Sequence, residues 1–319
     1  MKRLITAVST ALVVTAGAAM AEWPDDKPIT LIHPFAAGSD YLARLVGAAL
    51  EERLGQTVII ENRPGAGGAM GTGYAARQRP DGYTLVTSYP GPAANYTNTY
   101  KSLPYTPLED FDYISQMSYG DMVVAARLDF PADTPEELIA YLKAHPGEVS
   151  AGNNGIGSYG HMIELAISEE AGVPMRLVPY KGSPPIVTDM LSGSIDLSVD
   201  YLGESYIKHL EAGSIKAIAV VSAQRSKILP DVKTFKEVGI DLTAAPWGGI
   251  MAPKGTPPQI IERLNKAMTE YLTDPETIAT FARIGQTAAP TTPEEFKKIV
   301  ADEEAQWRPI IKKYGISNE

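Results

Sequence analysis

Three loops rich in small and polar residues are the segments of this sequence best suited to hold a ligand. They cover Phe35-Ala36-Ala37-Gly38-Ser39-Asp40, Gly65-Ala66-Gly67-Gly68, and residues 153–161. Each is expected to follow a strand and to open a helix, where free backbone N–H groups and the helix dipole favour an anion. Because the loops come from both halves of the chain, we predict one anion-sized ligand held between two lobes.

Each loop also has a plainer interpretation. The first can be an ordinary strand-to-helix turn in which Ser39 or Asp40 caps the helix. The second forms a nest of N–H groups, but no Gly-Lys-Ser/Thr follows it. Met70 also stands where a dinucleotide fingerprint needs its third glycine. We therefore expect neither a nucleotide nor a dinucleotide site.

The third loop raises the question of catalysis, since it contains a serine and a histidine. Gly157-Ser158-Tyr159-Gly160 does not have the GxSxG spacing of a nucleophile elbow. His161 lies about one helical turn from Ser158 and is better explained as a residue at a helix start. We predict a binding protein without enzymatic activity, and an exported serine hydrolase is the less favoured alternative.

Other residues near predicted strand ends are candidates for ligand contact. Asp200 is expected to end a strand, either facing the ligand or exposed as an ordinary acid. Tyr89, Tyr96 and Tyr159 lie where an aromatic face could meet a ligand, or they only rim the cleft. Trp247 is interpreted as a packing residue. The predicted binding set is Phe35, Ala36, Ala37, Gly38, Ser39, Asp40, Tyr89, Asn153, Asn154, Gly157, Ser158, Tyr159, His161 and Asp200.

Composition excludes several classes of function. The sequence has no cysteine, which removes disulfides, thiolate metal sites and a cysteine nucleophile. Its four histidines show no metal-ligand spacing, so we expect no metal and no cofactor. A formal net charge of −10 does not suit nucleic acid or an anionic membrane surface. An anionic ligand would have to be held by local donors, because the field of the whole chain repels it.

The order of hydrophobic segments predicts an α/β protein with two sheets. In the first half, strand, small-residue loop, helix and strand repeat, and Gly55 stops the first helix. A second α/β block follows, and the C-terminal third is helical and is expected to pack on the first block. Capping-box patterns begin at Thr134, Thr256 and Thr292. The predicted strands cover 28–34, 57–61, 83–87, 122–127, 149–152, 176–180, 195–200 and 215–222.

The first 21 residues have the features of a secretory signal peptide. Lys2 and Arg3 precede an apolar run, and Ala19-Met20-Ala21 has the small-x-small form that signal peptidase cleaves. The apolar run is too short for a membrane anchor and polar residues follow it at once. We expect cleavage after Ala21 and export of the mature chain.

Several short motifs occur in a characteristic order along the chain. They include Pro34-Phe35, Glu61-Asn62-Arg63-Pro64 with 65–68, Pro80-Asp81-Gly82-Tyr83, Val178-Pro179-Tyr180-Lys181-Gly182, and Trp247-Gly248-Gly249 with Ala252-Pro253-Lys254. With these motifs the chain resembles the periplasmic solute-binding proteins of tripartite tricarboxylate transporters, often called the Bug family. The resemblance runs from about Trp23 to Ile316.

The resemblance implies a two-lobed Venus-flytrap fold of the periplasmic-binding-protein type, with two sheets and two interdomain crossings. The expected division is 1–21 signal peptide, 22–122 plus 223–319 first lobe, and 123–222 second lobe. It also implies a monomeric periplasmic protein that captures a small organic carboxylate for membrane permease subunits. A ligand receptor for a sensor system is the alternative that the sequence does not separate from this function.

The chain departs from the family pattern in the two predicted ligand loops. The family's first loop usually reads Pro-Phe-Pro-Ala-Gly-Gly, two residues, then Asp, whereas residues 34–40 are two residues shorter and lack the second proline. Asn153 and Asn154 replace the usual small residues in the other loop and are expected to supply amide donors. The shortened loop and the nearby tyrosines make an aromatic dicarboxylate at least as good a candidate as an aliphatic acid.

Overall fold

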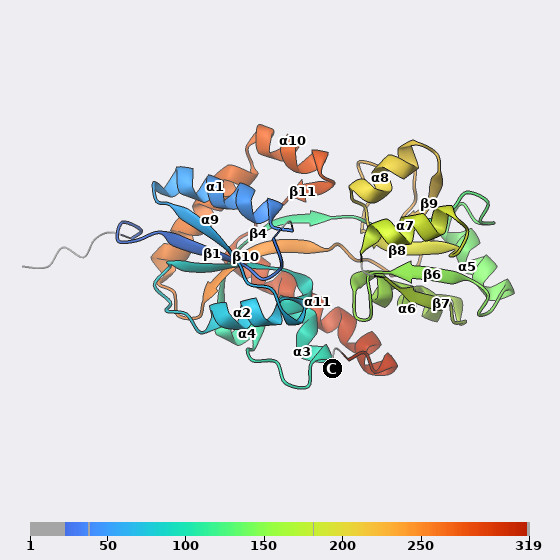
Figure 1. Cartoon of the computed structure of the whole chain (residues 1–319), viewed down its shortest axis with the longest axis horizontal. Coiled ribbons are helices and arrows are strands. Elements are labelled where there is room, and N and C mark those ends of the chain that lie inside the picture. Colours follow the sequence, from blue (N-terminus) through green and yellow to red (C-terminus); the bar gives the residue numbers. More distant parts are fainter. Residues whose placement is uncertain (1–22, 38, 181, 318–319) are drawn as a thin grey trace, which may run out of the picture.

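The computed structural model describes residues 23–37, 39–180 and 182–317 of the chain. The predicted signal peptide and Gly38 lie outside these residues. Two lobes, each built on one β-sheet, lie side by side along the long axis of the molecule (Figure 1). Among the described helices, none is long and apolar enough to cross a membrane.

The first lobe contains a six-stranded sheet in the order β11-β4-β10-β3-β1-β2. β1 is parallel to both β2 and β3, and β10 is antiparallel to both β3 and β4. The carboxyl ends of β1 and β3 therefore open onto the same edge of the sheet. The strands are β1 Ile29–His33, β2 Val58–Asn62, β3 Thr84–Ser88, β4 Phe111–Gly120, β10 Trp247–Pro253 and β11 Gln286–Ala288.

The second lobe contains a five-stranded sheet in the order β7-β6-β8-β5-β9. β6 is parallel to β7 and β8, whereas β5 is antiparallel to β8 and β9. The carboxyl ends of β6 and β8 lie together at one edge. The strands are β5 Met122–Arg127, β6 Ser150–Asn153, β7 Arg176–Pro179, β8 Leu197–Tyr201 and β9 Ile215–Val220.

Helices cover both faces of each sheet. The larger ones are α1 Tyr41–Leu54, α2 Ala69–Ala76, α5 Pro135–Ala144, α6 Tyr159–Ala171, α7 Ser183–Leu191, α8 Glu204–Glu211, α9 Pro258–Leu272, α10 Pro275–Arg283 and α11 Pro293–Tyr314. Shorter helical segments are α3 Tyr96–Thr99, α4 Pro107–Asp110 and the turns Ala66–Gly68, Gly91–Asn95 and Lys236–Val238.

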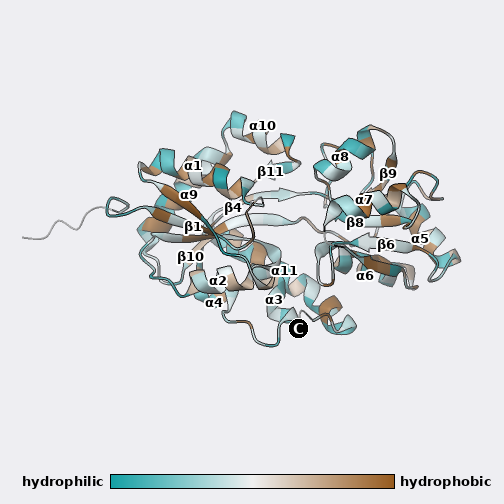
Figure 2. Cartoon of the chain, in the orientation of Figure 1, coloured by the Kyte–Doolittle hydropathy of each residue, from teal (hydrophilic) through white to brown (hydrophobic). Residues whose placement is uncertain are grey.

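The strands of the first sheet alternate their buried side chains between two cores. Leu31 and Leu85 pack with α1 and α9, whereas Ile32 and Val86, one residue further along, pack with α2 and α11. This period of two is the geometry of a strand buried on both faces. In Figure 2 both hydrophobic and hydrophilic colours occur along single helices, as expected for helices that bury one face.

The chain crosses between the lobes from β4 to β5 and again from β9 to β10, which confirms the two-lobed fold with two sheets. Helix α11 also spans both lobes. Phe296 and Val300 lie in the core of the first lobe, but Trp307 and Ile311 lie in the core of the second. The expectation that all C-terminal helices pack on the first block is therefore wrong for the second half of α11.

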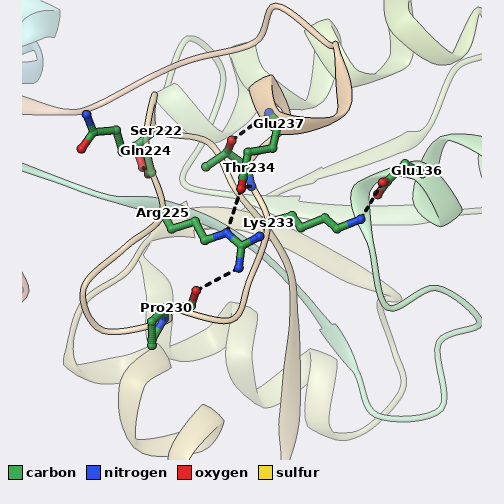
Figure 3. Close-up of polar contacts among 8 residues, drawn as sticks. All are labelled: Glu136, Ser222, Gln224, Arg225, Pro230, Lys233, Thr234 and Glu237. Carbon is green, nitrogen blue, oxygen red and sulfur yellow. Dashed lines mark hydrogen bonds and ion pairs between the residues drawn. The ribbon is translucent and has the colours of Figure 1, made fainter.

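The segment between β9 and β10 is anchored on the second lobe (Figure 3). Arg225 Nε donates to Glu237 Oε1 at 2.9 Å, and Lys233 Nζ donates to Glu136 of α5 at 2.8 Å. Phe235, which is fully buried, belongs to the second core. The domain division stays a prediction, but this packing favours a second crossing just before Trp247 rather than at residue 223.

We predict that Gly249→Ala destabilises the fold by about 1–3 kcal/mol, the usual cost of overpacking a core. An added Cβ would lie 2.1 Å from Phe296 Cζ and 2.8 Å from the carbonyl oxygen of Ser115. Gly47→Ala in α1 is the control. Its Cβ would lie within 3 Å only of Cδ1 at the end of the Ile60 side chain, and alanine favours a helix. Denaturant unfolding measures both. Equal stability of the two variants would contradict the packing of α11 on β10.

Candidate functional site

The loop after β1 is held in place by the ring of His33, which is 1% exposed. Its Nδ1 lies 3.0 Å from Thr87 Oγ1 and its Nε2 lies 3.1 Å from Ser39 Oγ. Ser39 donates its hydroxyl hydrogen to the carbonyl oxygen of Ala36, so we assign the ring hydrogen to His33 Nε2. Burial lowers the pKa of His33, which favours this neutral ring. The predicted anion loop is therefore tied to the end of β3.

Phe35 and Tyr89 form an aromatic wall beside this loop. Their rings meet edge to face with centroids 5.3 Å apart, and both contact His33 in the same way. Asp40 is buried and pairs with Arg44 at 2.6 Å, so both charges are already used within the helix start. Ala36 and Ala37 are exposed next to the wall. The first lobe thus presents small residues and one aromatic face.

The glycine-rich loop supports the first loop from behind. The hydroxyl groups of Tyr96 and Tyr100 donate to the carbonyl oxygens of Gly67 and Ala66, each at 2.9 Å. A Cβ on Gly68 would lie 3.0 Å from the ring of Phe35. Tyr96, a predicted ligand neighbour, therefore gives its hydroxyl hydrogen to this loop instead.

The third loop leads from β6 into the N-terminus of α6. Ser158 is the N-cap, and its Oγ accepts a hydrogen bond from the backbone N–H of His161 at 3.2 Å. The N–H of Gly157 donates to His161 Nδ1 at 3.2 Å, so the ring hydrogen must be on Nε2 when the ring is neutral. Burial lowers the pKa of His161 and favours that state. Ser158 Oγ–H and His161 Nε2–H are left to donate to an anion.

This geometry does not support the hydrolase alternative. In the described part of the chain, no hydrogen bond joins Ser158 Oγ to the His161 ring, and the nitrogen nearest the backbone is occupied by Gly157. A nucleophilic serine needs a ring nitrogen that accepts its proton. The described residues also hold no group of three or more His, Asp or Glu side chains able to bind a metal ion.

Two buried acids lie behind the third loop. Asn153 Nδ2 donates to Glu164 Oε2 at 2.6 Å, and Asn154 Nδ2 donates to Asp200 Oδ1 at 2.6 Å. Glu164 is fully buried and Asp200 is 1% exposed. Burial raises the pKa of both carboxyl groups, that of Glu164 to about 8. The two asparagines, expected to face the ligand, are therefore also tethers that fix the loop on buried acids.

Tyr159 points away from this loop toward α11. Its ring packs edge to face on Trp307, 6.0 Å between centroids, and its hydroxyl lies beside the carboxyl group of Glu303. Glu303 also accepts a hydrogen bond from Asn95 of the first lobe at 3.2 Å. Burial raises the pKa of Glu303, against the lowering effect of its neighbouring donors. Tyr159 therefore contributes to the junction of the lobes.

The structure thus gathers the predicted residues into two groups. One lies at the carboxyl ends of β1 and β3, and the other at the carboxyl ends of β6 and β8, on the sides of the lobes that face each other (Figure 1). Among the described residues, no hydrogen bond or ion pair joins residues 34–40 to residues 153–161. Sequence reasoning missed Glu164 and Glu303. A glutamate between Ile163 and Leu165 on an otherwise apolar helix was the available signal for Glu164.

Two α/β lobes joined by crossing strands, with small-residue loops at facing strand ends, define a bilobed solute-binding protein. The chain belongs to the tripartite tricarboxylate transporter family of receptors, whose family model matches residues 42–316.

Individual relatives agree with this assignment. The chain is 35% identical to Protein BugT of Bordetella pertussis, over 99% of this chain and 98% of that protein. The structure of Rpa4515 of R. palustris with adipate is 31% identical, with a TM-score of 0.78, covering 93% of this chain and 99% of that one. The periplasmic binding protein BugD is 33% identical, with a TM-score of 0.73, covering 92% and 99%.

We predict that Glu164→Gln makes the fold less sensitive to pH. The pKa of Glu164 is about 8 in the folded chain, above its ordinary value of 4.5, so folding stabilises the protonated form. The stability that this proton confers is therefore complete below about pH 4.5 and is lost as pH rises through about 8.

Glutamine cannot ionise but keeps an oxygen for Asn153. The variant should match the wild type near pH 4 and be the more stable of the two at pH 8, as measured by urea unfolding across this range. Glu170→Gln, on the surface of the same helix, is the control and should leave the dependence of unfolding free energy on pH unchanged. If the unfolding free energy of Glu164→Gln changed with pH as steeply as that of the wild type, this carboxyl group would be ionised in the folded chain.

Proposed function

We propose that this protein is a periplasmic, monomeric receptor that captures a small dicarboxylate and delivers it to the permease subunits of a tripartite tricarboxylate-type transporter. The family assignment and the similarity to a structure with adipate support this function. The expected signal peptide at 1–21 and the similarity to a periplasmic binding protein support the location.

The observation that carries the proposal is the pair of facing loops, each at the carboxyl ends of strands in its own sheet. In the second lobe the donors are Ser158 Oγ–H, His161 Nε2–H and the amides around the start of α6. In the first lobe they are the backbone N–H groups of Ala36 and Ala37, which are exposed beside the aromatic wall. One carboxylate at each loop would place a short dicarboxylate between the lobes.

The other predicted residues take supporting roles in this proposal. Asp40, Asn153 and Asp200 hold the loops in shape through Arg44 and the buried acids. Asn154 is exposed and keeps one amide hydrogen for a ligand oxygen. Tyr159 serves the junction of the lobes.

The geometry favours an aliphatic over an aromatic dicarboxylate. The aromatic proposal rested on the shortened first loop and on three tyrosines. Two of the tyrosines, Tyr96 and Tyr159, are turned to other partners. Phe35 and Tyr89 remain as a wall, and their edge-to-face packing on each other already uses part of both rings. The flexible methylene chain of an aliphatic diacid needs only apolar contact from Phe35 and Tyr89.

We expect adipate to raise the melting temperature of the mature protein and hexanoate, which has the same chain length and one carboxylate, to have little effect. At a ligand concentration of 100 times Kd, binding adds about 2.7 kcal/mol to stability, which gives a shift of several degrees. A thermal-shift screen followed by calorimetry measures both. Terephthalate tests the aromatic alternative, and heat from it without heat from any aliphatic diacid would overturn the aliphatic assignment. If no diacid gives a thermal shift or a heat of binding, the proposed ligand class is wrong.

We expect Ser158→Ala to weaken binding of the best diacid by roughly 0.5–3 kcal/mol, the range that spans neutral hydrogen bonds and hydrogen bonds to charged groups. The change also removes the N-cap of α6, which costs about 0.5–2 kcal/mol of stability. Thr134→Ala is the matched control, because Thr134 Oγ1 caps α5 in the same lobe by accepting from the N–H of Glu137 at 3.2 Å. It should lose similar stability and keep wild-type affinity. Unchanged affinity in folded Ser158→Ala would remove this hydroxyl from the site.

A further inference from the structure

Tyr201, the last residue of β8, reaches from the second lobe to the first. Its hydroxyl donates to the carbonyl oxygen of Gly285 at 2.9 Å and accepts a hydrogen bond from Gln286 Nε2. Gly285 immediately precedes β11, the edge strand of the first sheet. Neither β8 nor β11 continues into a crossing between the lobes.

The ring of Tyr201 rests on the first crossing. A Cβ on Gly120 would lie 2.2 Å from Tyr201 Cε2, so only glycine leaves room for the ring at the end of β4. A Cβ on Gly203 would lie 3.0 Å from the same ring. The tyrosine therefore lies directly over the point where the chain passes from one sheet to the other.

Tyr201 is also connected to the candidate loop of the second lobe. Asp200 Oδ1 accepts hydrogen bonds from the backbone N–H of Tyr201 at 2.7 Å and from Asn154 Nδ2 at 2.6 Å. Asn154 is exposed in the loop proposed to meet the ligand. A continuous series of contacts thus runs from Asn154 through Asp200 and Tyr201 to Gly285 of the other lobe.

This contact differs in kind from the backbone bonds along the crossings. Gly120 N–H donates to the carbonyl oxygen of Pro246, and Ala244 N–H donates to that of Val221. Both bonds join one crossing segment to the other, so they can be kept when the two segments bend together. A side chain that joins β8 to β11 must instead separate from its partner when one sheet rotates against the other.

We infer that Tyr201 is a positioning residue that clamps the lobes in the arrangement described here, in which no hydrogen bond or ion pair joins the described residues of the two candidate loops, and that closure requires its release. Removing the hydroxyl weakens that arrangement by the value of a neutral hydrogen bond, so the ratio of rearranged to clamped molecules should rise about two- to tenfold. The inference concerns the ligand-free protein and does not depend on which ligand is bound.

The test measures the distance between the lobes without ligand. The chain has no cysteine, so Glu52→Cys on α1 and Glu211→Cys on α8 accept spin labels at two defined places. Double electron–electron resonance should give Tyr201→Phe a larger population at a second distance than the wild type has. Gln286→Ala, on the opposite lobe, should shift the distribution in the same direction.

Tyr105→Phe is the matched control. Its hydroxyl donates to the carbonyl oxygen of Pro92 at 2.7 Å. Both residues lie in the first lobe, so the variant loses the same kind of bond without affecting a contact between the lobes. It should keep the wild-type distribution, and thermal unfolding confirms that all three variants are folded. A wild-type distribution in both Tyr201→Phe and Gln286→Ala, or an equal change in Tyr105→Phe, would overturn the clamp and leave the proposed ligand class untouched.

Discussion

The pairing of β4 with β10 is the constraint on which the relation between the lobes depends. The two strands lie next to each other in the first sheet, in antiparallel register from Trp247 opposite Tyr119 to Pro253 opposite Phe111. The first crossing begins at the end of β4, and the second crossing ends at the start of β10. The irregular register around Gly249 coincides with the place where Phe296 of α11 packs against the strand. This pair of hydrogen-bonded strands therefore fixes the first-lobe ends of both crossings and the start of the last helix.

The candidate site differs from an arginine clamp because the donors assigned to it carry no positive charge. The chain carries a net charge of −10, and two of its acids are buried behind the loop of the second lobe. Burial raises the pKa of Glu164 to about 8, so this group is mostly protonated at neutral pH and adds little negative charge. The neighbouring donors are a hydroxyl, a neutral imidazole and backbone amides. Neutral donors at a helix start can hold an anion without a full positive charge.

Local sequence signals predicted much of this fold. The strands ending at His33, Asn62 and Ser88 and the stop of α1 at Gly55 follow from hydrophobic runs bounded by glycine or polar residues. The helix starts at Thr134 and Thr292 form as expected, since both side chains accept the predicted backbone bond. At Thr256 the side chain donates to the carbonyl oxygen of Pro253 instead, and α9 begins only at Pro258.

Three strands of the first sheet, β4, β10 and β11, could not be predicted in this way. β4 contains Ser115 and Gln116 at buried positions. Ser115 Oγ donates to the carbonyl oxygen of Thr291, far away in sequence, and the backbone N–H of Gln116 donates to Thr291 Oγ1. β10 contains two adjacent glycines and a proline, which is typical of a loop. The glycines are explained by close packing against Met117 at Gly248 and against Phe296 at Gly249. The same holds for the site. The loops and Ser158 follow from local pattern, whereas Glu303 and Tyr201 depend on partners in the other lobe.

The placement of α11 has a consequence for how the chain acquires its structure. The strands and the other helices of the second lobe are complete in sequence before Trp247, but their core also contains Trp307 and Ile311. These two side chains arrive only at the end of synthesis, on a helix whose first half is fixed to the other lobe. The second lobe therefore cannot finish packing as an independent unit. The two lobes are distinct in architecture, but we expect them to unfold together, because one helix belongs to both cores.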